Sequence, residues 1–387
     1  MEDTPHIAQM QTYLFPFLAS IIFLIFHLII YRSLFAHLSD SKITKNIFKI
    51  LTFLNFIATL IYMFSRHHIL FPQWLFFILS ISIGIAFIFF IATILYYFFT
   101  LFILFLDKNK RKIYSLLLKK TIIVLTLFYI IYGIYNVQTP PILQKVSIPI
   151  SNLKIPLKII QLSDIHIGGL IGQKRVKQFV QIANAQNPDI IVLTGDIIDT
   201  NLNNAKNALK ELANLKSKFG IYYVLGNHEY LYDTNNIIQY LKNIGFNTLI
   251  NQNTLISIDN DPIINIAGVA DLMGNRMGYL QPDFKKALEG IDKKIPTILL
   301  SHQPKIIKYL KEKSPDAILT GHTHGGQIFP FSLAVLLEQP YLMGLHQINS
   351  NSFLYINQGT GFWGPPMRIG THSEITIINL VPKNTLH

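Results

Sequence analysis

The hydrophobic and polar positions of the 387-residue chain change their pattern near residue 137. Before that point the chain is dominated by long apolar runs, and a helix needs ~20 apolar residues to cross the hydrocarbon core of a bilayer. Buried core helices would also be apolar, but the length of the runs and their near absence of charge favour membrane spans. Four spans are predicted, at about Tyr13–Tyr31, Ile47–Phe64, Trp74–Leu106 and Thr121–Asn136. The third run is long enough for one tilted helix and too short for two spans and a turn.

Short apolar runs alternate with amphipathic segments in the rest of the chain. This rhythm is typical of an α/β fold whose helices pack on sheets. Strands are predicted at Leu157–Leu162, Asp189–Leu193, Ile221–Leu225, Ile263–Val269, Thr297–Leu300 and Ala317–Leu319, and helices at Arg175–Asn184 and Ala205–Leu215. We therefore predict a transmembrane region at 1–137, a stiff proline-containing linker at 138–153 and a folded domain at 154–387.

The net charge of +12 is unevenly distributed. Residues 1–150 carry 12 Lys and Arg against 4 Asp and Glu, whereas residues 151–387 carry 21 against 17. The basic excess therefore belongs mainly to the membrane region, and the second part contains no Arg/Lys stripe with interleaved aromatics, so no nucleic-acid partner is expected. The chain contains no cysteine, which excludes disulfides, thiolate metal ligands and a cysteine nucleophile.

Basic residues in the short loops predict the orientation of the spans, because cytoplasmic loops carry an excess of Lys and Arg. The second loop carries Arg66, whereas the first and third lie on the opposite side and are more basic. They contain Arg32, Lys42, Lys45 and Lys49, and Lys108, Lys110, Arg111, Lys112, Lys119 and Lys120. With four spans, the domain after residue 137 is then expected on the outer face of the cell membrane.

Polar groups suited to metal binding follow the predicted strands. Oxygen and imidazole ligands without cysteine are what hard or borderline divalent metals prefer, and two adjacent metals point to hydrolysis at phosphorus. Residues two apart in an extended chain point the same way, so Asp164 and His166 are expected to act together, as are His322 and His324. The groups are Asp164-Ile165-His166, Gly195-Asp196-Ile197-Ile198-Asp199, Gly226-Asn227-His228-Glu229, Ser301-His302 and Gly321-His322-Thr323-His324.

Each of these residues also has a simpler interpretation when taken alone. Asp164 or Asp196 could be an ordinary turn or helix-capping residue, and Asp199 could cap the next helix. A single His302 could be a hydrogen-bonded structural histidine. The occurrence of all five groups in one chain favours the metal site.

The ordered series D-x-H, G-D-x-x-D, G-N-H-E, a single His and G-H-T-H resembles the calcineurin-like metallophosphoesterase superfamily over essentially all of residues 155–380. The tail from Gly359 to Arg368, with the sequence GTGFWGPPMR, is similar to the bacterial membrane-associated branch related to YkuE and YaeI. This resemblance implies two facing sheets flanked by helices, so with the predicted spans we expect an α/β fold in which a four-helix transmembrane region precedes the two-sheet domain. The spans and the basic loops indicate an integral protein of the bacterial inner membrane, with the catalytic domain expected on the periplasmic or extracellular face.

The resemblance further implies a site for two divalent metal ions, with Mn, Fe, Zn and Co all open. Asp164, His166, Asp196 and His324 would hold the first metal, and Asp196 would bridge to a second that Asn227, His302 and His322 complete. His228 would stand near the leaving group, with Asp199 fixing the orientation of a ligand or of His228, and Glu229 orienting His228. The reaction implied is hydrolysis of a phosphomonoester, a phosphodiester or a pyrophosphate.

The stretch Ile328–Leu345 is unusually apolar and directly follows the metal-ligand motif. It is either core or an apolar lip that touches the membrane or an acyl chain. The spans and this stretch together favour a phosphorylated, lipid-linked substrate. Arg368 is interpreted either as a contact for substrate phosphate or as a solvated loop residue.

Two rival functions stay open. One is hydrolysis of UDP-2,3-diacylglucosamine in lipid A synthesis, whose cytoplasmic substrate conflicts with the predicted outward orientation. The other is a non-catalytic membrane receptor with a decayed phosphoesterase domain, which is disfavoured because every expected ligand position is filled. The sequence does not indicate the oligomeric state.

Overall fold

The computed structural model describes residues 6–66, 71–310 and 314–383. The chain forms two compact units. A helical unit comprises Met1–Gln138 together with Gly364–Ile369, and a catalytic unit comprises Thr139–Trp363 together with Gly370–His387. The short segment Gly364–Ile369 therefore belongs with the helices although it lies late in the sequence.

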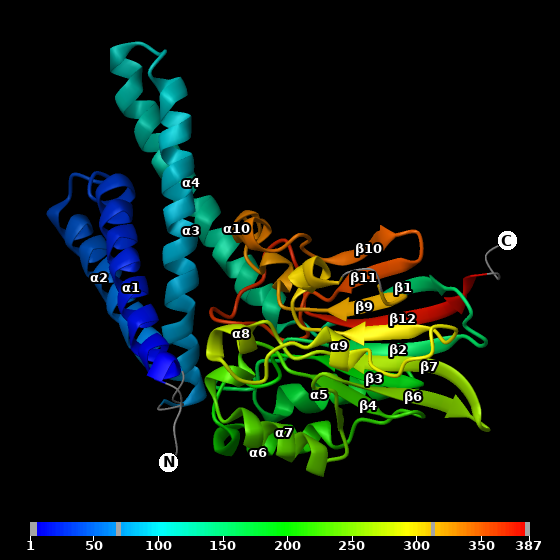
Figure 1. Cartoon of the computed structure of the whole chain (residues 1–387). Coiled ribbons are helices and arrows are strands. Elements are labelled where there is room, and N and C mark those ends of the chain that lie inside the picture. Colours follow the sequence, from blue (N-terminus) through cyan, green and yellow to red (C-terminus); the bar gives the residue numbers. More distant parts are fainter. Residues whose placement is uncertain (1–5, 67–70, 311–313, 384–387) are drawn as a thin grey trace. The chain divides into compact units, whose positions relative to one another are not determined.

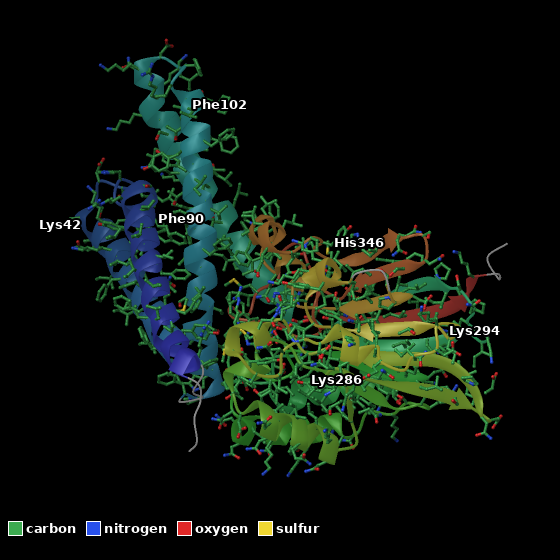
Figure 2. All side chains as sticks on the ribbon, viewed as in Figure 1. Lys42, Phe90, Phe102, Lys286, Lys294 and His346 are labelled. Carbon is green, nitrogen blue, oxygen red and sulfur yellow. The ribbon has the colours of Figure 1, made fainter. Side chains whose placement is uncertain are left out.

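The helical unit contains four long helices, which Figure 1 draws in blue to cyan. They are α1 (His6–Ile30, followed by a π-helical turn at Tyr31–Phe35), α2 (Lys42–Ser65), α3 (Gln73–Ile103) and α4 (Lys108–Gln138). Within the described residues these four are long and apolar enough to cross a membrane, which confirms the predicted number of spans. Large apolar side chains such as Phe53, Phe102 and Phe128 are about 60% exposed, a surface suited to lipid (Figure 2).

The third helix, α3, packs against α1, α2 and α4, and its buried positions include several small residues, which are common where helices pack in membranes. Ser80, Ser82, Gly84 and Ala86 are all buried on it. Polar contacts add to the packing, because the side-chain nitrogen of Asn55 donates to the carbonyl oxygen of Ser82 over 3.1 Å. The helical unit is therefore a packed assembly around α3.

Two six-stranded sheets form the centre of the catalytic unit. Both are mixed. In the first sheet the antiparallel pairing is that of β12 with β2, and the other pairings are parallel. In the second sheet the middle pairings are parallel and the two edge pairings are antiparallel. The first sheet has the order β1 (Ile142–Ile150), β12 (Glu374–Pro382), β2 (Leu157–Leu162), β3 (Ile190–Thr194), β4 (Ile221–Val224) and β5 (Asn247–Thr248). The second has the order β10 (Gly344–Asn349), β11 (Ser352–Ile356), β9 (Ala317–Thr320), β8 (Thr297–Leu300), β7 (Asp261–Gly268) and β6 (Gln252–Ile258).

The main core of this unit lies between the two sheets. Ile159 and Val192 from the first sheet and Ile266, Ile298 and Leu319 from the second belong to one buried cluster. A second cluster covers the other face of the second sheet, and Figure 1 shows α5, α6 and α7 beside the first sheet. The predicted sandwich of two sheets flanked by helices is thus confirmed. The helices are α5 (Gln173–Asn184), α6 (Leu202–Leu212), α7 (Thr234–Asn243), α8 (Met273–Met277), α9 (Phe284–Ala287) and α10 (Phe331–Glu338), with 3-10 turns at Glu229–Leu231, Pro304–Tyr309 and His324–Gly326.

The predicted linker at 138–153 is largely a strand. Residues Ile142–Ile150 form β1, which pairs in parallel with β12 over its whole length, and Ile148 and Ile150 are buried in the core. The prolines between Pro140 and Pro149 favoured a stiff linker. Within β1, Pro149 cannot donate a ladder hydrogen bond. An edge strand tolerates that loss, and β1 lies at the edge of its sheet.

The apolar stretch after the metal-ligand motif is mostly not core. Within it, α10 contains no buried residue, and Leu337 is 90% exposed. Phe331, Leu333 and Leu336 are also exposed. The core interpretation of this stretch is therefore wrong for α10, although Ile328 just before it is buried.

Candidate metal centre

The candidate ligands lie just beyond the carboxyl ends of five parallel strands, where α/β folds place their ligands. Three of these strands, β2, β3 and β4, belong to the first sheet, and β8 and β9 belong to the second. The site is therefore built by both sheets. In chain order the strands are followed by Asp164 and His166, Asp196, Asn227, His302, and His322 with His324.

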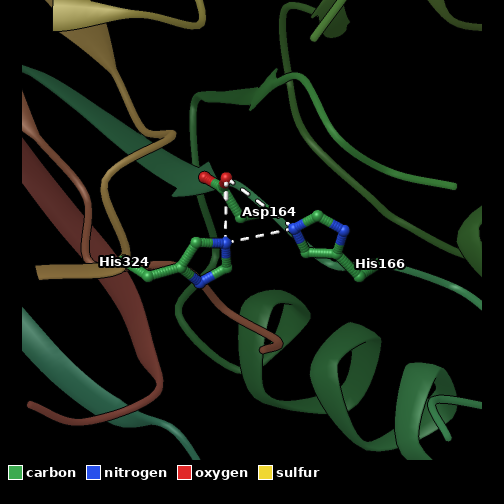
Figure 3. Close-up of side chains that lie close together, drawn as sticks. All are labelled: Asp164, His166 and His324. Atoms are coloured by element: carbon green, nitrogen blue, oxygen red, sulfur yellow. Dashed lines mark hydrogen bonds and ion pairs between the residues drawn. The ribbon is translucent and has the colours of Figure 1, made fainter. Parts of the chain in front are cut away.

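The first group of ligands consists of Asp164, His166 and His324 (Figure 3). The Nε2 atoms of His166 and His324 lie 3.1 Å apart. Oδ1 of Asp164 lies 3.4 Å from Nε2 of His324 and 4.0 Å from Nε2 of His166. All three side chains are buried, and one candidate ligand atom from each lies within 4.8 Å of the other two.

The second group consists of Asp196, His302 and His322, with Asn227 beside them. Nε2 of His302 lies 3.2 Å from Oδ2 of Asp196, 3.0 Å from Oδ1 of Asn227 and 3.1 Å from Nδ1 of His322. Four candidate ligand atoms thus surround a second point.

Asp196 connects the two groups through one oxygen. Its Oδ2 lies 3.2 Å from His302 in the second group and 3.9 Å from Nε2 of His166 in the first. Its Oδ1 accepts the backbone N–H of His228 over 2.8 Å. The carboxylate is therefore fixed by one oxygen, and the other faces both groups.

The hydrogen bond of His302 tests whether these residues suit a cation. Its Nδ1 lies 2.8 Å from the carbonyl oxygen of Thr194, so Nδ1 carries the proton and donates. In the neutral ring, Nε2 then has a lone pair aimed at the oxygens of Asp196 and Asn227, which are also acceptors. Acceptors that face one another at 3.0–3.2 Å need a cation between them. In the metal-free chain that cation is a proton on Nε2, because burial of His302 is outweighed by the carboxylate of Asp196, which raises the pKa of His302 well above its usual value. A divalent metal can take the place of this proton, so the set fits a divalent metal.

Five of the candidate ligands have a left-handed backbone, with φ of 51° at Asp164, 54° at His166, 52° at Asp196, 71° at His322 and 50° at His324. This conformation is uncommon outside glycine, although Asp and His adopt it more readily than most residues, and it gathers at functional sites. The extended geometry expected for the two pairs is therefore wrong. Because the chain coils at these points, His322 and His324 turn into different groups, whereas Asp164 and His166 stay in one.

Two glycines permit the close approach of these turns. A Cβ on Gly226 would lie 2.2 Å from Oδ1 of Asp196, and a Cβ on Gly321 would lie 1.9 Å from Oγ of Ser163 and 2.2 Å from Oδ2 of Asp164. Both contacts are too short for any side chain. Glycine at these positions is therefore required by the packing of the ligand loops.

Burial and charge shift the pKa values of the ligands in opposite directions. Burial raises the pKa of Asp164 to about 6, and burial with the charge of His228 lowers the pKa of His166 to about 4. Burial would also raise the pKa of Asp196, but the positive charges of His302 and His228 outweigh it and lower that pKa well below its usual value. The lowered pKa values of His166 and Asp196 give the neutral imidazole and ionised carboxylate that metal binding needs. Burial of His302 is outweighed by Asp196, so the pKa of His302 is raised and this ring must lose a proton when a metal binds.

The side chain of Asp199 contacts His228, which is one of the two partners that the sequence left open for it. Nδ1 of His228 lies 2.8 Å from Oδ1 of Asp199, which also accepts the hydroxyl of Tyr232 over 3.3 Å. Burial opposes the charge of this ring, but Asp196 and Asp199 outweigh it and raise the pKa of His228 to about 9. Asp199 does not cap the next helix, because the side chain of Asn201 does so.

Glu229 contacts backbone groups rather than the ring of His228. Its Oε1 accepts the N–H groups of Ile197 and Ile198, and its Oε2 accepts those of Asp196 and Gly226. The prediction that Glu229 orients His228 is therefore corrected. Its carboxylate ties the turn after β3, which carries Asp196, to the turn after β4.

Two contributors were absent from the predicted site. The Trp363 ring lies edge-on to His228, with centroids 5.9 Å apart, and the Thr194 carbonyl sets the proton position of His302. Trp363 lies in the tail motif Gly359–Arg368 that resembled a family pattern. The sequence therefore pointed to this residue but did not indicate what it does. The contribution of Thr194 comes from its backbone, which residue identity cannot reveal.

Comparison with known proteins gives the family. Residues 157–326 match the family model described as calcineurin-like phosphoesterase. An uncharacterized metallophosphoesterase of Campylobacter jejuni is 34% identical over 376 residues, which cover 96% of this chain and 99% of that protein. The chain belongs to the calcineurin-like metallophosphoesterase family. It is thus a metal-dependent phosphoesterase, and the interpretation as a decayed receptor does not hold.

Other relatives place this calcineurin-like metallophosphoesterase in a wider group. An uncharacterized metallophosphoesterase of Helicobacter pylori strain J99 is 40% identical over 253 residues, covering 65% of this chain and 67% of that protein. A Bos taurus protein named transmembrane protein with metallophosphoesterase domain is 39% identical over 259 residues, covering 64% and 58% of the two chains. A solved dimetal phosphatase from Danio rerio has 11% identity and a TM-score of 0.37 over 52% of this chain and 87% of that chain, which is too low to support a conclusion.

Proposed function

We propose that this metallophosphoesterase is a membrane-anchored two-metal phosphohydrolase that cleaves a phosphoester or pyrophosphate bond in a lipid-linked substrate. The observation that carries the two-metal proposal is the position of Asp196, whose Oδ2 faces both groups of ligands. Asp164, His166, Asp196 and His324 would hold one divalent metal. Asp196, Asn227, His302 and His322 would hold the other.

Two bound divalent metals supply polarisation of the phosphoryl oxygens and a water of lowered pKa. The residues of the chain do the rest. Four imidazoles and one amide keep the ligand set from neutralising the metals, so a negatively charged substrate is still attracted. The ring of His228 donates its Nδ1 proton to Asp199, and it holds a second proton at Nε2 because Asp196 and Asp199 outweigh burial and raise its pKa to about 9. It donates that proton to the oxygen of the leaving group.

The lipid-linked class of substrate is supported by α10. This helix begins seven residues after His324, the last residue of the ligand motif, and its apolar side chains are exposed rather than packed in the core. The four membrane-spanning helices keep the catalytic unit at a bilayer at all times. A substrate with an acyl chain would lie in the same bilayer as these helices, and its chain could contact the exposed apolar side chains of α10.

An outer-face position of the catalytic unit is supported by the basic residues of the first and third loops. A reporter that is active only outside the cytoplasm, fused at the C-terminus, should therefore be active. An inactive fusion, together with an active cytoplasmic reporter, would reverse the orientation. That result would favour the UDP-2,3-diacylglucosamine pyrophosphatase alternative, whose substrate is cytoplasmic.

The proposed reaction is tested on the full chain purified in detergent. Wild-type protein should contain about two equivalents of divalent metal per chain and hydrolyse bis-p-nitrophenyl phosphate, with lipid pyrophosphates or phospholipids cleaved faster. Asp196→Asn should lose both activity and metal, whereas Asp292→Asn, at an exposed aspartate, should retain both. Unchanged hydrolysis by Asp196→Asn would refute the two-metal mechanism, and slower cleavage of lipid substrates than soluble ones would refute the substrate class.

A further inference from the structure

A short segment from the last part of the chain is built into the membrane helices. Gly364–Ile369 belongs to the helical unit and is hydrogen-bonded to α4 at two points. The backbone N–H of Arg368 donates to the carbonyl oxygen of Gly133 over 3.0 Å, and the side chain of Asn136 donates to the carbonyl oxygen of Arg368 over 2.9 Å. Arg368 is fully buried, so its interpretation as a solvated loop residue is wrong.

Two helix glycines accept the side chains of this segment. A Cβ on Gly84 of α3 would lie 2.6 Å from Sδ of Met367, and a Cβ on Gly133 of α4 would lie 2.7 Å from Cγ1 of Ile369. Met367 and Ile369 are both buried. Glycines at these positions let the segment seat against α3 and α4, as small residues do between membrane helices.

The residue before this segment lies in the candidate metal centre. Trp363 stands edge-on to His228, and Gln327 holds its backbone at two points. The N–H of Trp363 donates to Oε1 of Gln327 over 3.0 Å, and Nε2 of Gln327 donates to the carbonyl oxygen of Trp363 over 2.7 Å. Past the segment, the hydroxyl of Thr371 donates to the carbonyl oxygen of Gln327 over 3.2 Å. One residue therefore clamps both ends of the loop.

The connection between Trp363 and the residues that pack on the helices is short. Only Gly364, Pro365 and Pro366 lie between Trp363 and Met367. Proline fixes its own φ and restricts the residue before it, so this connection is stiff. A shift of Met367 would therefore pass to Trp363 rather than be absorbed by a flexible loop.

We propose that α3 and α4 position Trp363 against His228 through the segment Gly364–Ile369. Trp363 is then a positioning residue whose ring limits rotation of the imidazole that protonates the leaving oxygen. This inference rests on the proposed role of His228. It gives the membrane helices a second purpose beyond anchoring, because they set the geometry of the proton donor.

The catalytic end is tested with substrates that differ in their leaving group. A misplaced proton donor slows esters with poor leaving groups, such as phenyl, more than activated p-nitrophenyl esters. Trp363→Ala should therefore lower kcat for the phenyl ester about tenfold more than for the p-nitrophenyl ester, with unchanged metal content. Trp363→Phe should restore most of the difference. An equal loss on both esters, or a loss of metal, would show a general structural role and overturn the proposal.

The membrane end is tested by changing the fit at Gly133. Gly133→Ala should push Ile369 away and reproduce the selective loss on the phenyl ester. The double variant Gly133→Ala with Ile369→Ala removes the clash and should recover the wild-type ratio, while Ile369→Ala alone controls for the lost side chain. Thermal unfolding of each variant in detergent separates misfolding from repositioning. If folded Gly133→Ala kept the wild-type ratio of kcat between the phenyl and p-nitrophenyl esters, the proposal that the helices position Trp363 would be overturned.

A spectroscopic signal reports the position of Trp363 directly. The chain contains two tryptophans, so Trp74→Phe leaves Trp363 as the single indole fluorophore. In the Trp74→Phe protein, Gly133→Ala should shift the fluorescence emission maximum of Trp363. Adding Ile369→Ala should restore the original emission maximum. This measurement also distinguishes two failures. If Asp196→Asn stays active, the proposed function is wrong, whereas unchanged emission and ester ratio in Gly133→Ala refute the coupling alone.

Discussion

Nδ1 of His228 lies 2.8 Å from Oδ1 of Asp199, and this contact joins the turn after β4 to the region after β3. Because the carboxylate engages Nδ1, the other ring nitrogen is left to face the site, 3.8 Å from Oδ2 of Asp196. The pair of residues therefore defines which nitrogen can exchange a proton with a substrate.

Asp199→Asn should weaken the proton donor. We expect kcat for a phenyl phosphate ester to fall by about 10²-fold, in the range of general acid catalysis. Asp199 also helps to raise the pKa of His228 to about 9, so the variant should lower that pKa. His228 must be protonated to donate, and activity falls as pH rises through its pKa, so the alkaline limb of the kcat profile should move to lower pH. An unmoved alkaline limb would contradict the assignment of His228 as the acid.

Glu229→Gln should destabilise the catalytic unit. Each carboxylate oxygen of Glu229 accepts two backbone N–H groups, and in glutamine one oxygen becomes an NH₂ that faces two donors. Leaving buried donors unsatisfied costs about 1–3 kcal/mol. Thermal unfolding should report this loss with reduced activity, because the backbone that carries Asp196 is released. Glu289→Gln, at an exposed glutamate, should leave the unfolding temperature unchanged.

Chelation of metal should inactivate the enzyme and lower its unfolding temperature together. A ligand that binds only the folded state at 100 times its Kd stabilises that state by about 2.7 kcal/mol. On removal Nε2 of His302, which faces the oxygens of Asp196 and Asn227, should take up a proton in place of the metal. Titration of Mn, Fe, Zn or Co back into the apoprotein should restore both properties. In His302→Ala, chelation should lower the unfolding temperature by less than in the wild type. A fall as large as in the wild type would place the metal elsewhere.

Charges on α10 should affect lipid substrates selectively. The double variant Leu333→Glu with Leu337→Glu changes two exposed side chains, so the fold should be retained. We expect a fall of about tenfold in activity on lipid-linked substrates in vesicles, because moving charge into the lipid interface is costly. Hydrolysis of soluble bis-p-nitrophenyl phosphate should be unchanged. Leu255→Glu, at an exposed leucine on β6, is the matched control, and equal losses on both substrates would contradict a lipid-contacting role.

Patterns of hydrophobic residues predicted most of the fold. The strands that precede the ligand motifs are buried on both faces, so their apolar runs stood out, as at Ile190–Thr194. β12 at Glu374–Pro382 and the edge strand β1 were missed. They pair with each other although more than 200 residues separate them, and no local pattern reveals a partner so distant.

The candidate site was predicted in its membership but not in its backbone. Residue type and order identified the side chains that converge, including Asp199 beside His228. Their left-handed conformations were not foreseen, because a two-residue spacing was interpreted as extended chain. The role of Glu229 was also wrong, since its partners are backbone N–H groups that sequence does not show.

The position of β1 affects how the two units can be separated. Three residues, Thr139 to Pro141, connect the end of α4 to a strand that completes the first sheet. A truncation that removes residues 1–150 would take away the membrane helices but would also uncover the edge of β12. An unprotected strand edge recruits strands from other molecules, so the released unit should aggregate unless Ile142–Ile150 stays with it. Detachment from the membrane and loss of solubility are thereby linked in one short stretch of chain.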